Sequence, residues 1–202
     1  KAALLYKRKK FDEMANYLCD EFVALGGVYI KFLQGVLLRS EIMQRWHNPN
    51  RLKIFENVES EPLNISSYLQ SKLSKDQVSK IAGVQPEPFA AGSFGQVYYA
   101  QLNDGSQVVI KVLRPMIREL LNHDLRLLYM FYKTFFVKMY KNVDLNLGQA
   151  VVDFKKATLN ETDYLHEANF ANELYQYYKN HPSLVIPETF LDLCNENIIV
   201  QE

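Results

Sequence analysis

The sequence predicts an α+β fold in which helices are segregated from an antiparallel sheet of five strands. Before about residue 84, apolar residues recur at helical steps of three and four, and after it short β-rich runs take over. Between two such runs, Asn103-Asp104-Gly105 predicts a hairpin, because glycine accepts the positive φ that a tight turn requires. We therefore expect a helical extension over residues 1–84 and a sheet-containing domain over 85–202.

The extension is expected to contain mainly helices. The predicted segments cover about residues 9–25, 27–46 and 64–73. Ser74 with Gln77 three residues later is typical of an N-cap, and opens a short helix to Ala82 that Gly83 would end.

The second part alternates strands and helices. The predicted strands cover 96–101, 107–112, 186–191 and 197–201, and the predicted helices cover about 116–140 and 149–179. Pro115 suits the start of the first helix, and the second would end before His181-Pro182.

Composition excludes several classes of protein. The chain has 202 residues, of which 48% are hydrophobic and 23% charged, so it is long and apolar enough to bury a core. Its 23 basic and 23 acidic residues balance, which argues against a nucleic-acid-binding protein. The two cysteines, Cys19 and Cys194, lie far apart and the histidines are scattered. We therefore expect no disulfide framework, no metal site within this chain, and a reducing compartment.

The most apolar stretch covers residues 127–140 and carries Lys133 and Lys138. It is too short and too charged for a membrane-spanning helix, which needs roughly 20 apolar residues. Its aromatic residues leave two interpretations open: contact with neighbouring domains, or a helix that meets a membrane surface or a partner protein. The chain begins without Met, and we expect it to be a piece of a longer protein.

A glycine-containing loop carries the strongest local signal. It reads Ala90-Ala91-Gly92-Ser93-Phe94-Gly95-Gln96-Val97. Glycines let the backbone approach a ligand, and free amides can hold phosphate oxygens, although the same glycines would also suit a plain β-turn. The loop leads into a strand, which excludes a dinucleotide-binding loop that opens a helix.

A lysine in the next strand is the second signal. Lys111 ends the apolar run Val108–Ile110, where an unpaired ammonium is costly to bury, unless it points to solvent from an edge strand. Loop, Val97 and lysine together match the nucleotide-binding pattern of protein kinases. Such a lysine needs a carboxylate from a following helix. Asp163 and Glu167 share a helical face, where two acids repel unless cations meet them or the face is solvated.

In combination these motifs resemble the UbiB/AarF (ADCK) family of atypical kinase-like proteins, from about residue 20 to the end. The matching segments are the loop at 88–98, the lysine strand with its Arg-Pro at 109–115, the helix at 124–128, and Glu161-Thr162-Asp163-Tyr164 with Glu167. Upstream, Tyr29 to Gln34 with Arg39 resembles the family's Lys-x-Gly-Gln helix. The resemblance implies that the sheet is a protein-kinase-like N-lobe.

The resemblance also implies a set of site residues. For ATP or ADP with Mg²⁺ these are Ala90, Ala91, Gly92, Ser93, Phe94, Gly95, Val97, Lys111, Gln201 and Glu202. Lys111 would contact phosphates and pair with Glu167 as the catalytic pair. In the regulatory extension, Lys31 would pair with Glu161 and Asp163, and Gln34 would reach the nucleotide pocket. An extension in that place favours ATP hydrolysis or a small or lipid substrate over a protein substrate.

By the same resemblance we expect an atypical kinase or ATPase that supports the biosynthesis of ubiquinone or other isoprenoid lipids. It would be a peripheral membrane protein on the cytoplasmic or organellar-matrix side, with lipid-biosynthetic partners. A conventional small-molecule kinase and a pseudokinase scaffold are the alternatives. Leu33 stands where the family has Gly, and Gly92 where it usually has a third Ala. The 202 residues contain neither a catalytic-loop Asp with its downstream Asn nor an Asp-Phe-Gly, as expected if the C-lobe is absent, so this chain should not transfer phosphate by itself.

Overall fold

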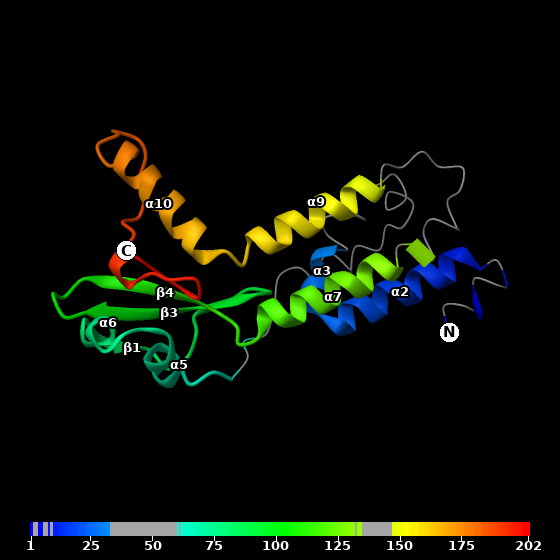
Figure 1. Cartoon of the computed structure of the whole chain (residues 1–202), viewed down its shortest axis with the longest axis horizontal. Helices are drawn as coiled ribbons and strands as arrows, with labels where there is room; N and C mark the ends of the chain where they lie inside the picture. Colours follow the sequence, from blue (N-terminus) through cyan, green and yellow to red (C-terminus); the bar gives the residue numbers. More distant parts are fainter. Residues whose placement is uncertain are drawn as a thin grey trace. The chain divides into compact units, whose positions relative to one another are not determined.

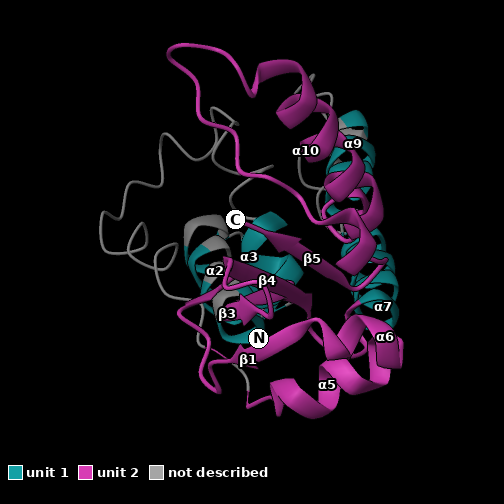
Figure 2. Cartoon of the chain, turned by 90° about the vertical axis from the view of Figure 1, so that its left-hand side faces the viewer, with its two compact units in different colours: residues 1–57, 118–158 teal, residues 58–117, 159–202 magenta. Residues whose placement is uncertain are grey.

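A computed structural model of the chain describes two compact units. The described residues are 1, 4–5, 8, 10–32, 60, 62–131, 133–134 and 147–202. Unit 1 comprises residues 1–57 and 118–158, and unit 2 comprises residues 58–117 and 159–202 (Figure 2). These units divide the chain differently from the boundary expected at residue 84, which stays a prediction.

Unit 2 contains an antiparallel five-stranded sheet, which confirms the predicted α+β class. The strands are β1 (Ile81–Val84), β2 (Ala90–Ala91), β3 (Gly95–Leu102), β4 (Gln107–Leu113) and β5 (Ile198–Gln201) (Figure 1). Their order is β1-β3-β4-β5, and the short β2 also pairs with β3. The predicted hairpin joins β3 to β4, with Gly105 at a φ of 91° and the Ser106 N–H donated to the Asp104 carboxylate.

Two of the strands differ from the prediction. The short helix stops at Ser79, and Ile81–Val84 then pairs with β3, while the N–H of Asn103 bonds the carbonyl of Lys80. The strand predicted over 186–191 forms only one bridge, between Thr189 and Gln201, before a 3₁₀ turn over Leu191–Leu193. Pro187 lies inside this segment and has no N–H to donate to a ladder.

Helices α5 (Ile65–Lys72) and α6 (Lys75–Ser79) precede the sheet. The predicted capping box of α6 is confirmed, because Ser74 and Gln77 each bond the other's backbone N–H. The hydroxyl of the buried Tyr68 donates to the Leu113 carbonyl at 2.8 Å and so attaches α5 to the end of β4.

The single helix predicted over 149–179 is two helices. They are α9 (Leu147–Asn160) and α10 (Tyr164–Tyr178). The Thr162 hydroxyl bonds the Leu159 carbonyl, and the Asp163 carboxylate accepts the N–H of His166 as the N-cap of α10. Both side chains compete with the helical backbone for its partners, which ends one helix and starts the next.

Side chains of the sheet alternate between two faces. The core face carries Tyr98, Ile110, Val112, Ile198 and Val200, all fully buried. Val97 pairs with Lys111 and Tyr99 with Val109, so these four side chains share the opposite, more open face. The strand alternation therefore places the predicted lysine on the face that is free to meet a ligand.

Unit 1 is held together by aromatic contacts. Its helices are α2 (Phe11–Leu25), α3 (Gly27–Phe32) and α7 (Ile117–Phe131), with the first part of α9. Phe22 lies 5.5 Å from both Tyr29 and Phe131 by ring centroids. Tyr29 donates to Asp124, and burial together with this carboxylate raises the pKa of Tyr29 to about 12.

Parts of two predicted helices lie outside the described residues. They are residues 33–46 of the second helix, with Leu33, Gln34 and Arg39, and residues 135–140 of the aromatic helix. Among the helices that the structure describes, none has the length and apolarity to cross a membrane.

The buried thiol of Cys194 allows a chemical test of its packing against β5. Its buried sulfur accepts the N–H of Val200 at 3.3 Å, and burial raises the pKa of the thiol. We therefore expect iodoacetamide to alkylate Cys194 at least about ten times more slowly in the folded protein than in urea at the same pH. Peptide mass spectrometry separates this site from Cys19. Equal rates would contradict the buried placement.

Candidate functional site

The structure brings Lys111 of β4 and Glu167 of α10 together. The Lys111 Nζ lies 2.7 Å from Oε1 and 2.9 Å from Oε2 of Glu167. Their side chains are 33% and 44% exposed, so the ion pair is accessible from the open face of the sheet. A cation held in place by a carboxylate, and still reachable by an anion, is an arrangement that can bind phosphate.

The glycine loop closes the hairpin between β2 and β3. The Gly92 N–H donates to the Gly95 carbonyl at 2.8 Å, so this amide belongs to the turn and is not free for a ligand as the sequence had suggested. Phe94, at the tip, is buried. Arg114 had no expected role beyond the matching Arg-Pro passage, yet it holds the loop in place. Its backbone N–H donates to the Phe94 carbonyl and its guanidinium donates to the Gly92 carbonyl.

Two aromatic side chains lie on the open face near the ion pair. Phe89 and Tyr99 stack with ring centroids 4.0 Å apart and planes 18° apart. They are 48% and 47% exposed. Sequence reasoning missed this pair, although Tyr99 follows Val97 by two residues and period two places both on the face of Lys111.

Gln201 and Glu202, which were predicted to contact the nucleotide, lie beside the open face of the sheet. Gln201 pairs with Val109 across β4 and β5, and therefore shares the face of Lys111. Its side chain donates to the Thr189 hydroxyl at 3.0 Å, and the Glu202 N–H donates to the Glu188 carbonyl. The two backbones are therefore held firmly at the rim of the open face.

The repulsion expected between Asp163 and Glu167 is relieved because each carboxylate has a partner of its own. Asp163 caps α10 and Glu167 pairs with Lys111, so the two carboxylates are separately occupied. Lys31 lies at the end of α3 in unit 1, whereas Glu161 and Asp163 belong to unit 2. Their pairing stays a prediction, and Gln34 lies outside the described residues.

Residues 54–202 match the ABC1 atypical kinase-like domain. The chain belongs to this family. It is 28% identical over 179 residues to the probable protein kinase UbiB of Azotobacter vinelandii, an alignment that covers 88% of this chain and 33% of that protein. It is 30% identical over 206 residues to the probable protein kinase UbiB of Cronobacter sakazakii, covering 96% and 36%. The chain thus spans about a third of the length of these relatives.

A solved structure of Rv3197 with erythromycin, from Mycobacterium tuberculosis, matches in fold. The TM-score is 0.55 at 20% identity, over 98% of this chain and 50% of the other. The kinase-like fold expected from the sequence motifs is therefore confirmed for this ABC1-family chain.

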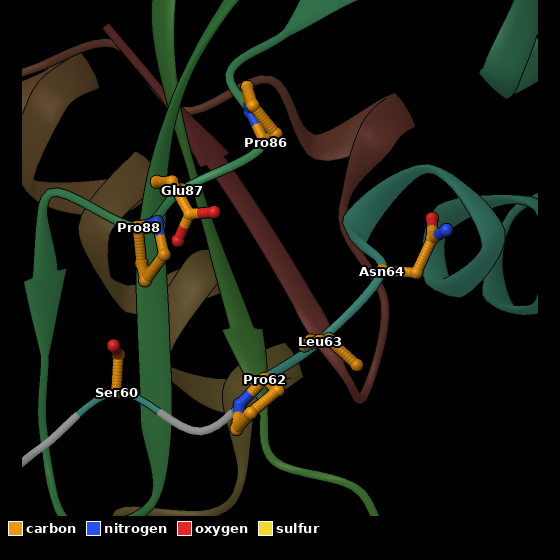
Figure 3. A pocket seen from close by; sticks show the side chains of 7 residues that line it. All are labelled: Ser60, Pro62, Leu63, Asn64, Pro86, Glu87 and Pro88. Atoms are coloured by element: carbon orange, nitrogen blue, oxygen red, sulfur yellow. The ribbon is translucent and has the colours of Figure 1, made fainter.

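A separate hollow of about 490 Å³ lies in unit 2 (Figure 3). It is lined by Ser60, Pro62, Leu63, Asn64, Pro86, Glu87 and Pro88. Its lining includes neither Lys111 nor Glu167.

The described residues of this ABC1-family chain contain no group of three His, Cys, Asp or Glu side chains that could hold a metal ion.

Proposed function

We propose that unit 2 binds ATP or ADP, with Mg²⁺, as the nucleotide-binding part of an atypical kinase or ATPase. The observation that carries the proposal is the Lys111–Glu167 ion pair on the open face of the sheet, beside the loop at 90–97. In the kinase pattern the lysine neutralises nucleotide phosphates and the glutamate holds the lysine. Family membership in the ABC1 atypical kinase-like group supports the same assignment.

Each neighbouring element would then take a defined part in binding. The loop fastened by Arg114 would cover the phosphates. Phe89 and Tyr99 would offer an apolar surface to the base, and the backbone of Gln201 and Glu202 would border the base edge. Mg²⁺, bound to the phosphates, would supply charge neutralisation.

We extend the proposal to the function of the whole protein, because this chain spans only about a third of the length of its UbiB relatives. The motif resemblance suggests a kinase or ATPase with a role in ubiquinone or other isoprenoid-lipid biosynthesis at a membrane surface. The relatives, named probable protein kinases, support the kinase part of this function. Lys31, Gln34, Glu161 and Asp163 would connect the helical extension to the nucleotide site. A pseudokinase scaffold is the second candidate. A catalytic Asp and a metal-binding Asp in the downstream part of the protein would favour the enzyme, and their absence there would favour the scaffold.

The direct test is the thermal stability of the chain with millimolar Mg-ATP or Mg-ADP. A ligand that binds only the folded state at 100 times its Kd stabilises it by about 2.7 kcal/mol, and we expect the unfolding midpoint to rise by several degrees. Mg²⁺ with inorganic phosphate serves as the control for a nonspecific ionic effect. No shift with either nucleotide, confirmed by calorimetric titration, would contradict nucleotide binding by this chain.

A further inference from the structure

Tyr164, the first residue of α10, lies beneath the ammonium of Lys111. The Lys111 Nζ is 4.6 Å from the centroid of the Tyr164 ring, within the range of a cation–π contact. Only 1% of the Tyr164 surface is exposed, so the contact is shielded from water on the ring side. Tyr164 and Glu167 are three residues apart in the first turn of α10, and such residues share a helical face. Lys111 thus receives two contacts from one turn of helix.

The hydroxyl of the same tyrosine packs against the end of the glycine loop. A Cβ built at Gly95 would lie 2.3 Å from the Tyr164 Oη, which shows that the phenol occupies the space beside this glycine. Gly95 begins β3, and its carbonyl closes the loop through Gly92. One side chain therefore touches both the loop and the lysine of the proposed phosphate site.

We propose that Tyr164 is a positioning residue that couples the start of α10 to Lys111 and to the nucleotide loop. The inference rests on the proposed nucleotide site. The ring would hold the ammonium where phosphates meet it, and the hydroxyl would set the distance between helix and loop. A shift of the first turn of α10 would then move both phosphate-binding elements together.

The competing interpretation is a tyrosine that only fills the core. Substitutions can distinguish the two roles, because the contact with the cation depends on the electron density of the ring face, whereas core packing depends on the size of the side chain. Tyr164→Phe keeps the ring, Tyr164→Leu removes it, and pentafluorophenylalanine at position 164 keeps the shape while withdrawing electron density from the ring face. Tyr177→Leu, on the same helix and 80% exposed, is the matched control.

In calorimetric titrations with Mg-ATP we expect the leucine and pentafluorophenylalanine variants to bind about five to ten times more weakly than Tyr164→Phe. Adenosine, which has no phosphate, should bind all variants alike. In a Lys111→Met background the leucine and pentafluorophenylalanine variants should bind Mg-ATP as tightly as Tyr164→Phe, since the ring contact acts through the lysine. Equal ATP affinity of the phenylalanine and pentafluorophenylalanine variants would overturn the inference.

A second measurement needs no nucleotide. Acetylation of Lys111 by a limiting amine-reactive ester, read by peptide mass spectrometry against the exposed Lys75, should be about three times or more faster in the pentafluorophenylalanine variant than in Tyr164→Phe. If the wild-type chain fails to bind Mg-ATP but this difference appears, the nucleotide proposal fails while the positioning role stands. Unchanged acetylation in a folded variant would overturn the positioning role itself.

Discussion

Gly95→Ala is expected to destabilise unit 2 by about 2–3 kcal/mol, whereas Gly92→Ala in the same loop should change its stability by less than about 0.5 kcal/mol. A Cβ at Gly95 would lie 2.3 Å from the Tyr164 Oη and 2.7 Å from the Val112 carbonyl oxygen. The Val112 carbonyl belongs to the backbone of a paired strand and Tyr164 is buried. Moving either group away from a new Cβ would therefore cost free energy. At Gly92 the nearest atom is 3.8 Å away, which is ordinary contact.

Urea unfolding followed by circular dichroism measures the difference between these two alanine variants. The double variant Gly95→Ala/Tyr164→Phe should regain part of the loss, because without the hydroxyl the nearest ring atom is 3.5 Å from the new Cβ. Full recovery is not expected, since the clash with Val112 remains. Equal stability of Gly95→Ala and Gly92→Ala would contradict the packing described for the loop.

Local signals in the sequence predicted the parts of the site that depend on a few neighbouring residues. The hairpin at Asn103-Asp104-Gly105 and the capping box at Ser74 were predictable, because glycine conformation and capping chemistry act over three or four positions. The proximity of Lys111 and Glu167 was predictable for another reason, since it came from a family pattern of spaced motifs.

The remaining parts depend on contacts between distant segments. β1 and β2 are short, and they form because β3 offers both of them partners. The loop contacts of Arg114 and the position of Tyr164 under Lys111 arise only when the sheet and α10 are packed together. A signal for Tyr164 was present in its spacing of three from Glu167, but this spacing becomes informative only once the partner of Glu167 is known.

Lys111→Met is expected to weaken Mg-ATP binding by about 10- to 100-fold, because it removes a charged hydrogen-bond donor to phosphate worth about 1.5–3 kcal/mol. The same change should alter the free energy of unfolding by no more than about 1 kcal/mol, since the Lys111–Glu167 pair is half exposed and screened by solvent. Binding and stability should therefore respond separately, which distinguishes a ligand-binding lysine from a structural one.

The matched control is Lys80→Met, in the same unit. Lys80 also forms an ion pair, at 2.9 Å from Asp192, but it lies at the end of α6 and outside the sheet face of Lys111. Calorimetric titration should find its ATP affinity unchanged within about two-fold, while Glu167→Gln should fall between the two because Lys111 keeps its charge and loses its anchor. If Lys111→Met and Lys80→Met bound ATP equally well, the ion pair at Glu167 would be one more surface salt bridge, and the nucleotide site would have to lie elsewhere.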